Sequence, residues 1–235
     1  MFNKERPLRA SKVVASSIAL GILFAAVSAP AVADGEVALA VQNQFVTTFQ
    51  NTRYQTANVF DAINGPGVRL GAAWLIRSKH GIQGRIMTYV PSAGDPYTLW
   101  LVVFNRPSEC ATTPCSAADI ANPAVDASVF NGSGAISASN GLGGGVINFD
   151  FARLAGRLPR DLFVLVGDPR GLFRNRGFAA EIHLVVDQHP PIVPGADSWI
   201  ADLTTTNFPG AGPSFNVAAA IFLACPGASC PASVL

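Results

Sequence analysis

Short segments that are apolar, or that alternate between apolar and polar residues, recur along this chain, and residues that favour turns separate them. Helical periodicity is nearly absent, so the pattern predicts strands. The clearest segment is 97–104, in which β-branched and aromatic residues occupy both faces, as in a strand that is covered on both sides. Further strands are predicted at 68–76, 83–90, 127–130, 134–139, 146–154, 162–166 and 179–187.

About eight such strands in one domain predict an all-β fold, an antiparallel β-sandwich with loops rich in Gly and Pro. The loop 139–145 contains Asn140-Gly141 between two alternating segments and therefore predicts a hairpin. A phosphate-binding loop would need a helix after it, whereas a strand follows here. The pattern leaves 216–224 open between a last strand and a short helix, and it predicts short helical turns at 116–119 and within 150–158.

The N-terminus has the order of a secretory signal, with a basic start, an apolar segment at 13–27 and Ala31-Val32-Ala33 before Asp34. The apolar segment has about 15 residues, fewer than the roughly 20 that a transmembrane helix needs. We therefore expect a signal helix at 1–33 that is cleaved after Ala33, and a single domain at 34–235. The mature protein is expected to be exported, periplasmic or extracellular, with no transmembrane anchor.

Removal of residues 1–33 changes the formal charge from +1 to about −2 and leaves Lys79 as the only lysine. Nucleic-acid binders depend on clustered cations that neutralise phosphates, so this composition argues against nucleic acid as a partner. An envelope polymer or a small ligand fits it better.

The four cysteines form two closely spaced pairs, Cys110 with Cys115 and Cys225 with Cys230. In an exported protein such spacing indicates disulfides, and of the three possible pairings we favour the two local ones. Each short loop would stabilise the fold by roughly 2 kcal/mol. The alternative is a zinc site made of four thiolates.

The segment 181–189 has aliphatic residues at positions 182, 184 and 186 and mainly polar residues at odd positions. On a strand, Glu181 and His183 would share one face about 7 Å apart, and with His80 they could hold copper or zinc. The alternative is a polar strand face without a metal. His189 lies too far along the strand to join His183, and Pro190-Pro191 places it at a strand end.

Six arginines lie between Arg153 and Arg176, and Arg170, Arg174 and Arg176 are the candidate anion-binding residues among them. The alternative is a solvated face paired with nearby aspartates. Three tryptophans would stack on sugars if they are exposed, or belong to the core if they are not. They are Trp74, Trp100 and Trp199.

Two stretches carry a resemblance to a known group. Residues 97–110, continued by 115–120, and residues 171–186 resemble motifs of a family of bacterial exported proteins, although Arg176 stands where that family usually has proline and Phe178 is an extra residue. The family implies no activity that can be transferred. More distantly the layout is similar to the sandwiches of chordin-type and copper/zinc superoxide dismutase domains, but the dismutase His-x-His pattern is missing, so dismutase activity is not implied.

No nucleophile elbow and no coherent catalytic triad can be recognised in the sequence. We therefore expect a non-catalytic binding protein or envelope component. The alternatives are a copper or zinc protein that uses His183, Glu181 and His80, and a protein that binds polyanions or carbohydrates through 153–176.

Overall fold

The computed structural model describes residues 52–156, 164–167, 171–191, 214–227 and 230–231, all of which belong to the unit 43–235. The predicted signal peptide at 1–33 lies outside these residues, as do Arg157, Arg160, Asp161, Asp168, Arg170 and Trp199.

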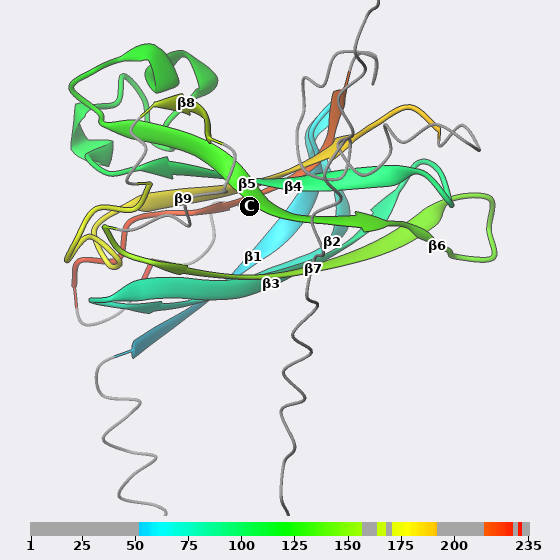
Figure 1. The fold of residues 1–235 in the computed structure, drawn as a ribbon, viewed down its shortest axis with the longest axis horizontal. Coiled ribbons are helices and arrows are strands. Elements are labelled where there is room, and N and C mark those ends of the chain that lie inside the picture. The colour runs from blue at the N-terminus through cyan, green and yellow to red at the C-terminus, as the bar shows by residue number, and fades with distance from the viewer. Residues whose placement is uncertain (1–51, 157–163, 168–170, 192–213, 228–229, 232–235) are drawn as a thin grey trace, which may run out of the picture. The chain divides into compact units, whose positions relative to one another are not determined.

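The described part of the chain contains ten strands, which are arranged in two layers (Figure 1). Their bounds are β1 Thr52–Asp61, β2 Gly65–Ser78, β3 Gly81–Val90, β4 Pro96–Phe104, β5 Ala127–Ile136, β6 Ala138–Ser139, β7 Gly145–Leu154, β8 Val164–Gly167, β9 Glu181–Gln188 and β10 Phe215–Phe222. The predicted all-β class is confirmed.

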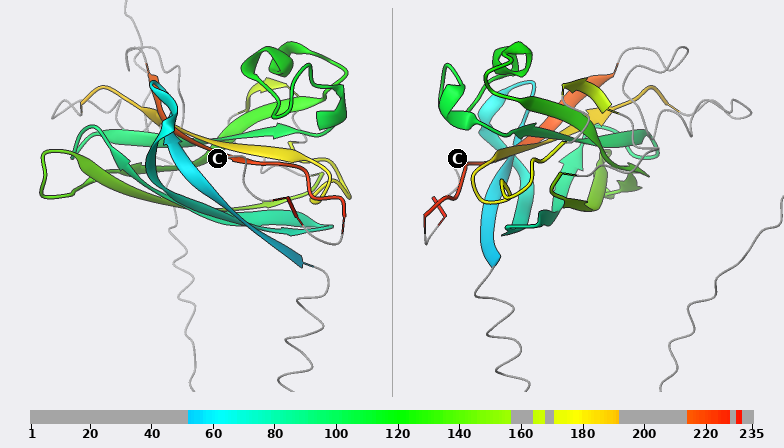
Figure 2. Two further views of the ribbon diagram at one scale, coloured as in Figure 1. Left: turned by 180° about the vertical axis from the view of Figure 1, so that it is seen from behind. Right: turned by 60° about the vertical axis from the view of Figure 1, so that its left-hand side comes forward.

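The strands form one continuous sheet in the order β6-β7-β3-β2-β1-β10-β9-β4-β5-β8, and every neighbouring pair is antiparallel. A sandwich, as the sequence predicts, has two separate sheets, whereas the described strands pair into one. The sheet continues through the corner because β1 pairs with β10 at Phe60 with Ala219 and at Asp61 with Ala218. The two halves of the sheet then face each other across one core, as the rotated views show (Figure 2).

The sequence pattern located most strands but not all. It missed β1, whose inward positions include the polar Gln55 as well as Ala57 and Val59, so that the apolar alternation is weak. The predicted segment 127–130 and the first part of 134–139 belong to one long strand, β5. The end of 134–139 is the short strand β6. The segment 216–224, left open between a strand and a helix, contains the strand β10. No helical turn forms at 150–154, because β7 continues to Leu154, and residues 157–158 lie outside the described residues.

Strand β4 is buried at all nine positions, as its sequence predicts. One face contributes Leu99, Leu101 and Val103 to the main core. The other face contributes Trp100 and Phe104 to a second, smaller core.

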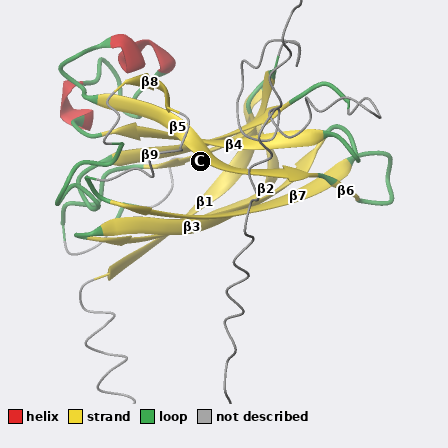
Figure 3. Ribbon diagram, in the orientation of Figure 1, coloured by secondary structure: helices red, strands yellow, loops and turns green. Residues whose placement is uncertain are grey.

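The second core lies under the loop 105–126, which contains two short 3₁₀ helices, η1 Pro107–Glu109 and η2 Ala117–Ala121 (Figure 3). The predicted turn at Ser116 forms. The Asp119 carboxylate accepts hydrogen bonds from the backbone N–H of Ala111 and of Ser116, at 2.9 and 2.7 Å. These two helices, of three and five residues, are the helices of the described residues. Neither is long enough to cross a membrane.

Both predicted disulfides form. Cys110–Cys115 closes the loop over the second core, and Cys225–Cys230 closes a loop that follows β10. Two disulfides fit an oxidising compartment outside the cytoplasm.

The corner between β1 and β10 is held by the buried side chain of Arg77 rather than by a long ladder of backbone hydrogen bonds. Its Nε donates to Gln55 Oε1 at 2.5 Å, and the side chain is fully buried. Its two terminal nitrogens donate to four backbone carbonyls, those of Gly177, Ala180, Phe222 and Leu223, at 2.7 to 3.2 Å. Burial lowers the pKa of Arg77 to about 9, which still leaves it charged at neutral pH.

A second arginine joins β7 to β5 where the sheet comes back on itself. Arg153 Nη2 donates to the carbonyls of Asn131 and Gly132 at 2.9 and 2.7 Å. Beyond this point β6 pairs with β7 at Val146 and Gly145. The guanidinium thus supplies hydrogen bonds between β5 and β7, and burial lowers its pKa.

We predict that Arg77→Met destabilises the protein by more than about 3 kcal/mol, because four buried carbonyls and Gln55 lose a charged donor. Urea denaturation of the mature protein measures the change. The stability of Arg77→Lys should lie between that of the wild type and that of Arg77→Met, since one ammonium group cannot reach all of the acceptors. The exposed Arg69→Met serves as control and should change stability by no more than about 0.5 kcal/mol. Equal stability of the Arg77 and Arg69 variants would contradict the role of Arg77.

Candidate binding face

The side of β1, β2, β3 and β7 that points away from the core, called the outer face below, is organised in rows by the strand register. One row consists of Tyr54, Ile76, Gln83 and Ala152. The next row consists of Thr56, Trp74, Arg85 and Asp150. A third row consists of Asn58, Ala72, Met87 and Asn148.

Large apolar side chains are exposed on the outer face. Tyr54 is 61% exposed, Tyr89 57% and Met87 46%, while Trp74 is partly buried. Their exposure together on one face of four adjacent strands makes this face the candidate binding surface.

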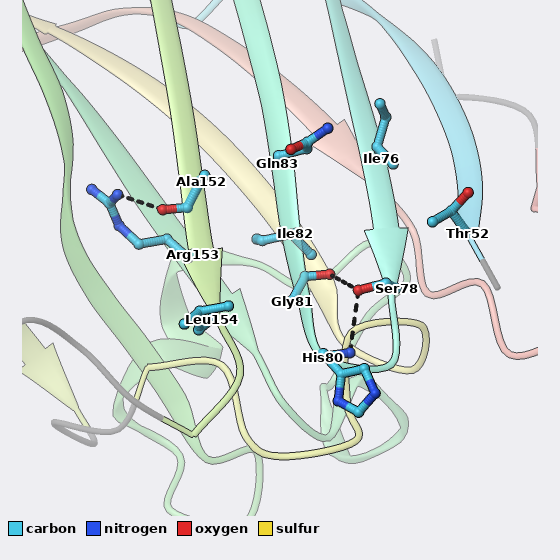
Figure 4. Close-up of a pocket in the computed structure, with 10 residues that line it drawn as sticks. All are labelled: Thr52, Ile76, Ser78, His80, Gly81, Ile82, Gln83, Ala152, Arg153 and Leu154. Atoms are coloured by element: carbon cyan, nitrogen blue, oxygen red, sulfur yellow. Dashed lines mark hydrogen bonds between the residues drawn. The ribbon is translucent and has the colours of Figure 1, made fainter. Parts of the chain in front are cut away.

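Two hollows open to solvent on the outer face and share Ile76, Gln83 and Ala152. The first has a volume of about 310 Å³ and reaches the turn between β2 and β3, where His80 stands at its end (Figure 4). The second, of about 430 Å³, extends the first toward Trp74 and Asp150. Because they share one row, the hollows form a continuous depression that follows the strands.

The second row carries an ion pair whose guanidinium group lies over the indole ring of Trp74. Arg85 Nε lies 2.5 Å from Asp150 Oδ1, and Arg85 Nη2 donates to Asp150 Oδ2 at 2.9 Å. The guanidinium carbon lies 5.3 Å from the centre of the Trp74 ring. The Asp150 carboxylate, through its hydrogen bonds and its charge, raises the pKa of Arg85.

This pair is solvent-exposed, so it adds little to stability. What it provides is a planar set of donors and acceptors fixed next to an aromatic ring. Its two charges cancel, and the other residues of the three rows are uncharged. The centre of the outer face therefore suits a ligand without net charge.

Comparison of the chain with family models, curated proteins and solved structures finds no match. The membership in a family of bacterial exported proteins stays a prediction, and the functional argument rests on the geometry of the chain itself.

The structure brings two of the three predicted metal ligands together. His183 Nε2 lies 2.6 Å from Glu181 Oε1, the same oxygen that accepts a hydrogen bond from the Cys115 N–H at 2.7 Å. Glu181 is buried, and His183 packs edge-on against Phe104 in the second core. The pair therefore anchors the disulfide loop to β9.

His80, the third predicted ligand, lies in the β2–β3 turn beside the first hollow. Across the described parts of the chain, no three His, Cys, Asp or Glu side chains gather in a group that could hold a metal ion.

The arginines of the predicted anion-binding segment differ in their surroundings. Arg153 is occupied by backbone carbonyls, Arg174 is exposed and Arg176 is partly buried. Arg170 lies outside the described residues. Of the tryptophans considered for sugar stacking, Trp100 belongs to the second core, and Trp74 lines the second hollow.

Sequence reasoning missed a polar cluster at the other end of β9. His189 is 1% exposed, and its Nε2 lies 2.7 Å from Thr98 Oγ1. Asp187 is 5% exposed and pairs in register with Thr98, so both point to the same side of the sheet. Among the described residues, Asp187 Oδ1 and His189 Nδ1 have no hydrogen-bond partner. The shared odd parity of 187 and 189 was visible in the sequence, but their burial was not.

Burial shifts both titratable groups of this cluster toward their neutral forms. It raises the pKa of Asp187 from 3.8 to about 6, against a weak hydrogen bond from Ser214, and it lowers the pKa of His189 from 6.5 to about 4. A hydroxyl bonded to a neutral imidazole resembles part of a catalytic triad. Thr98 is fully buried, however, so a substrate has no access to it in this arrangement.

We predict that Asp187→Asn stabilises the protein at about pH 8 and that the gain disappears toward about pH 4. In the folded protein the carboxyl has a raised pKa, so its ionisation destabilises the fold above about pH 6, and the penalty is lost as the pH falls to the unfolded value. The change in the variant's advantage between the two conditions is about 3 kcal/mol at most.

Urea denaturation of both proteins at each pH gives this difference. His189 titrates in both proteins with the opposite effect on stability, so its contribution cancels to first order. A pH-independent difference between the two proteins would show that Asp187 is not held in a neutral form.

Proposed function

We propose that the protein is an exported, non-catalytic binding protein whose outer face binds a neutral polysaccharide. The observation that carries this proposal is the continuous depression on the outer face, which places the Trp74 ring and the internally neutralised Arg85–Asp150 pair side by side.

The chemistry of a sugar matches both parts of this arrangement. The C–H face of a pyranose ring is apolar and packs against an aromatic ring, as Trp74 offers here. Sugar hydroxyls both donate and accept hydrogen bonds, and the guanidinium, the carboxylate and the Gln83 amide supply the complementary groups. A neutral chain introduces no charge that would compete with the ion pair.

The shape of the depression favours a polymer over a small molecule. Pockets for small ligands enclose most of the ligand surface, whereas both hollows here are open and follow the sheet. The hollows also offer few groups for acid–base catalysis. The described hollows contain one carboxylate, that of Asp150, and Arg85 holds both of its oxygens.

We predict that Trp74→Ala weakens binding to polysaccharide by about tenfold or more, because the stacking surface is lost. Native affinity electrophoresis of the mature protein in gels that contain amylopectin, xylan, mannan, galactan or hydroxyethyl cellulose measures this. The wild-type protein should be retarded by at least one of them. Phe215→Ala is the control, because Phe215 is an exposed aromatic residue, at 58%, that lies on β10 and not on the outer face.

Failure of all five polymers to retard the wild-type protein would overturn the proposal. So would retardation that is unchanged in Trp74→Ala. Retention on heparin that Arg174→Gln abolishes would instead support the polyanion alternative.

We further predict that Asp150→Asn reduces retardation by the same polymer while the melting temperature stays within about 2 °C. The exposed ion pair contributes little to stability, but its loss removes a fixed acceptor and frees Arg85. A circular dichroism melt provides the stability measurement. Loss of stability in parallel with loss of binding would show that the pair has a structural role and would argue against direct contact with sugar.

A further inference from the structure

The rows that surround Trp74 do not end at the two hollows. We propose that the polysaccharide chain lies parallel to β3 and contacts the protein from the β2–β3 turn, at His80, to Tyr89, so that the site takes an extended and unbranched segment of several sugars. This inference rests on the proposed function and deepens it.

The direction follows from the way the hollows are joined. The first hollow covers the row of Ser78, Gly81 and Leu154 and the row of Ile76, Gln83 and Ala152. The second begins on that same row and continues to Trp74 and Asp150. Each step is along β2, β3 and β7, not across them, so a chain that fills both hollows must follow the strands.

Exposed side chains continue the same line beyond Trp74. Met87 occupies the next row on β3, and Tyr89 follows it. Outward-pointing residues on a strand repeat every second position, so Arg85, Met87 and Tyr89 all face the ligand side. Tyr89 lies about 14 Å along the strand from the Trp74–Arg85 row, which is beyond the reach of one sugar ring.

The other end of the line is polar and exposed. The Ser78 hydroxyl accepts a hydrogen bond from the His80 N–H at 3.2 Å and donates one to the Gly81 carbonyl at 3.2 Å, which shapes the turn (Figure 4). The His80 side chain is exposed beside the first hollow. From Gly81 to Tyr89 the strand measures about 27 Å, which defines the length of ligand that can be bound.

The structure also limits branching. Leu154, 65% exposed, stands at the β7 side of the first hollow, and Tyr54, 61% exposed, flanks Ile76 on the β1 side. Because side chains lie on both flanks, a ligand can extend only along the strands. The branch of a branched sugar would collide with these side chains.

The test is isothermal titration of the mature protein with a series from disaccharide to octasaccharide, prepared from the polymer that retards it. Affinity of the wild-type protein should rise with length until the chain spans His80 to Tyr89. Tyr89→Ala should bind the shortest oligosaccharides like the wild type and lose about tenfold or more with the longest, because only these reach position 89. Phe215→Ala is again the control and should follow the wild type at every length.

The outcomes separate the two proposals. Affinity that does not rise beyond the disaccharide, or a Tyr89→Ala variant that matches the wild type at every length, overturns the extended site but leaves the binding face in place if Trp74→Ala still binds weakly. A series in which Trp74→Ala binds as well as the wild type at every length overturns the binding face and the extended site together.

Discussion

The closure of the sheet depends on arginine side chains that donate to backbone carbonyls. Within the described residues, β1 and β10 share two ladder pairs. Hydrogen bonds from the Arg77 side chain, and one from Gln55 Nε2 to the Leu223 carbonyl, add to them at this corner. Arg153 does the same between β5 and β7. A buried arginine is costly unless its donors are satisfied, and Arg77 uses Nε and both terminal nitrogens. Cationic side chains thus replace part of the strand ladder.

Because of this closure, the two sides of the sheet differ in what covers them. Inside, the two halves share one core, which buries the inward-pointing apolar residues of β1, β2, β3 and β7. On the other half, the outward side of β4 and β9 is covered by the disulfide loop 105–126, which Glu181 holds through the Cys115 N–H. The outer face of β1, β2, β3 and β7 has exposed rings and no such cover among the described residues, and it therefore is the surface on which we place binding.

Apolar alternation, turn residues and cysteine spacing are local properties of a chain. They are the reason why the sequence predicted the all-β class, the hairpin at Asn140-Gly141 and both disulfides. Long-range pairing is not local. The predicted strand 68–76 ends just before Arg77, and the carbonyls that Arg77 binds come from segments a hundred or more residues away. The neighbourhood of Trp74, Arg85 and Asp150 likewise depends on the registers of three strands. The Glu181–His183 contact was predicted from spacing, whereas the loop that buries it was not.

The most direct test of the binding face is a nuclear magnetic resonance titration of the mature protein with the oligosaccharide that binds it, followed through the side-chain N–H signals of Trp74 and Arg85. We predict that both signals shift on saturation, together with backbone amides of β2, β3 and β7, while those of the 105–126 loop stay in place. Shifts confined to that loop or to the segment around Arg174, with Trp74 and Arg85 unchanged, would contradict the account.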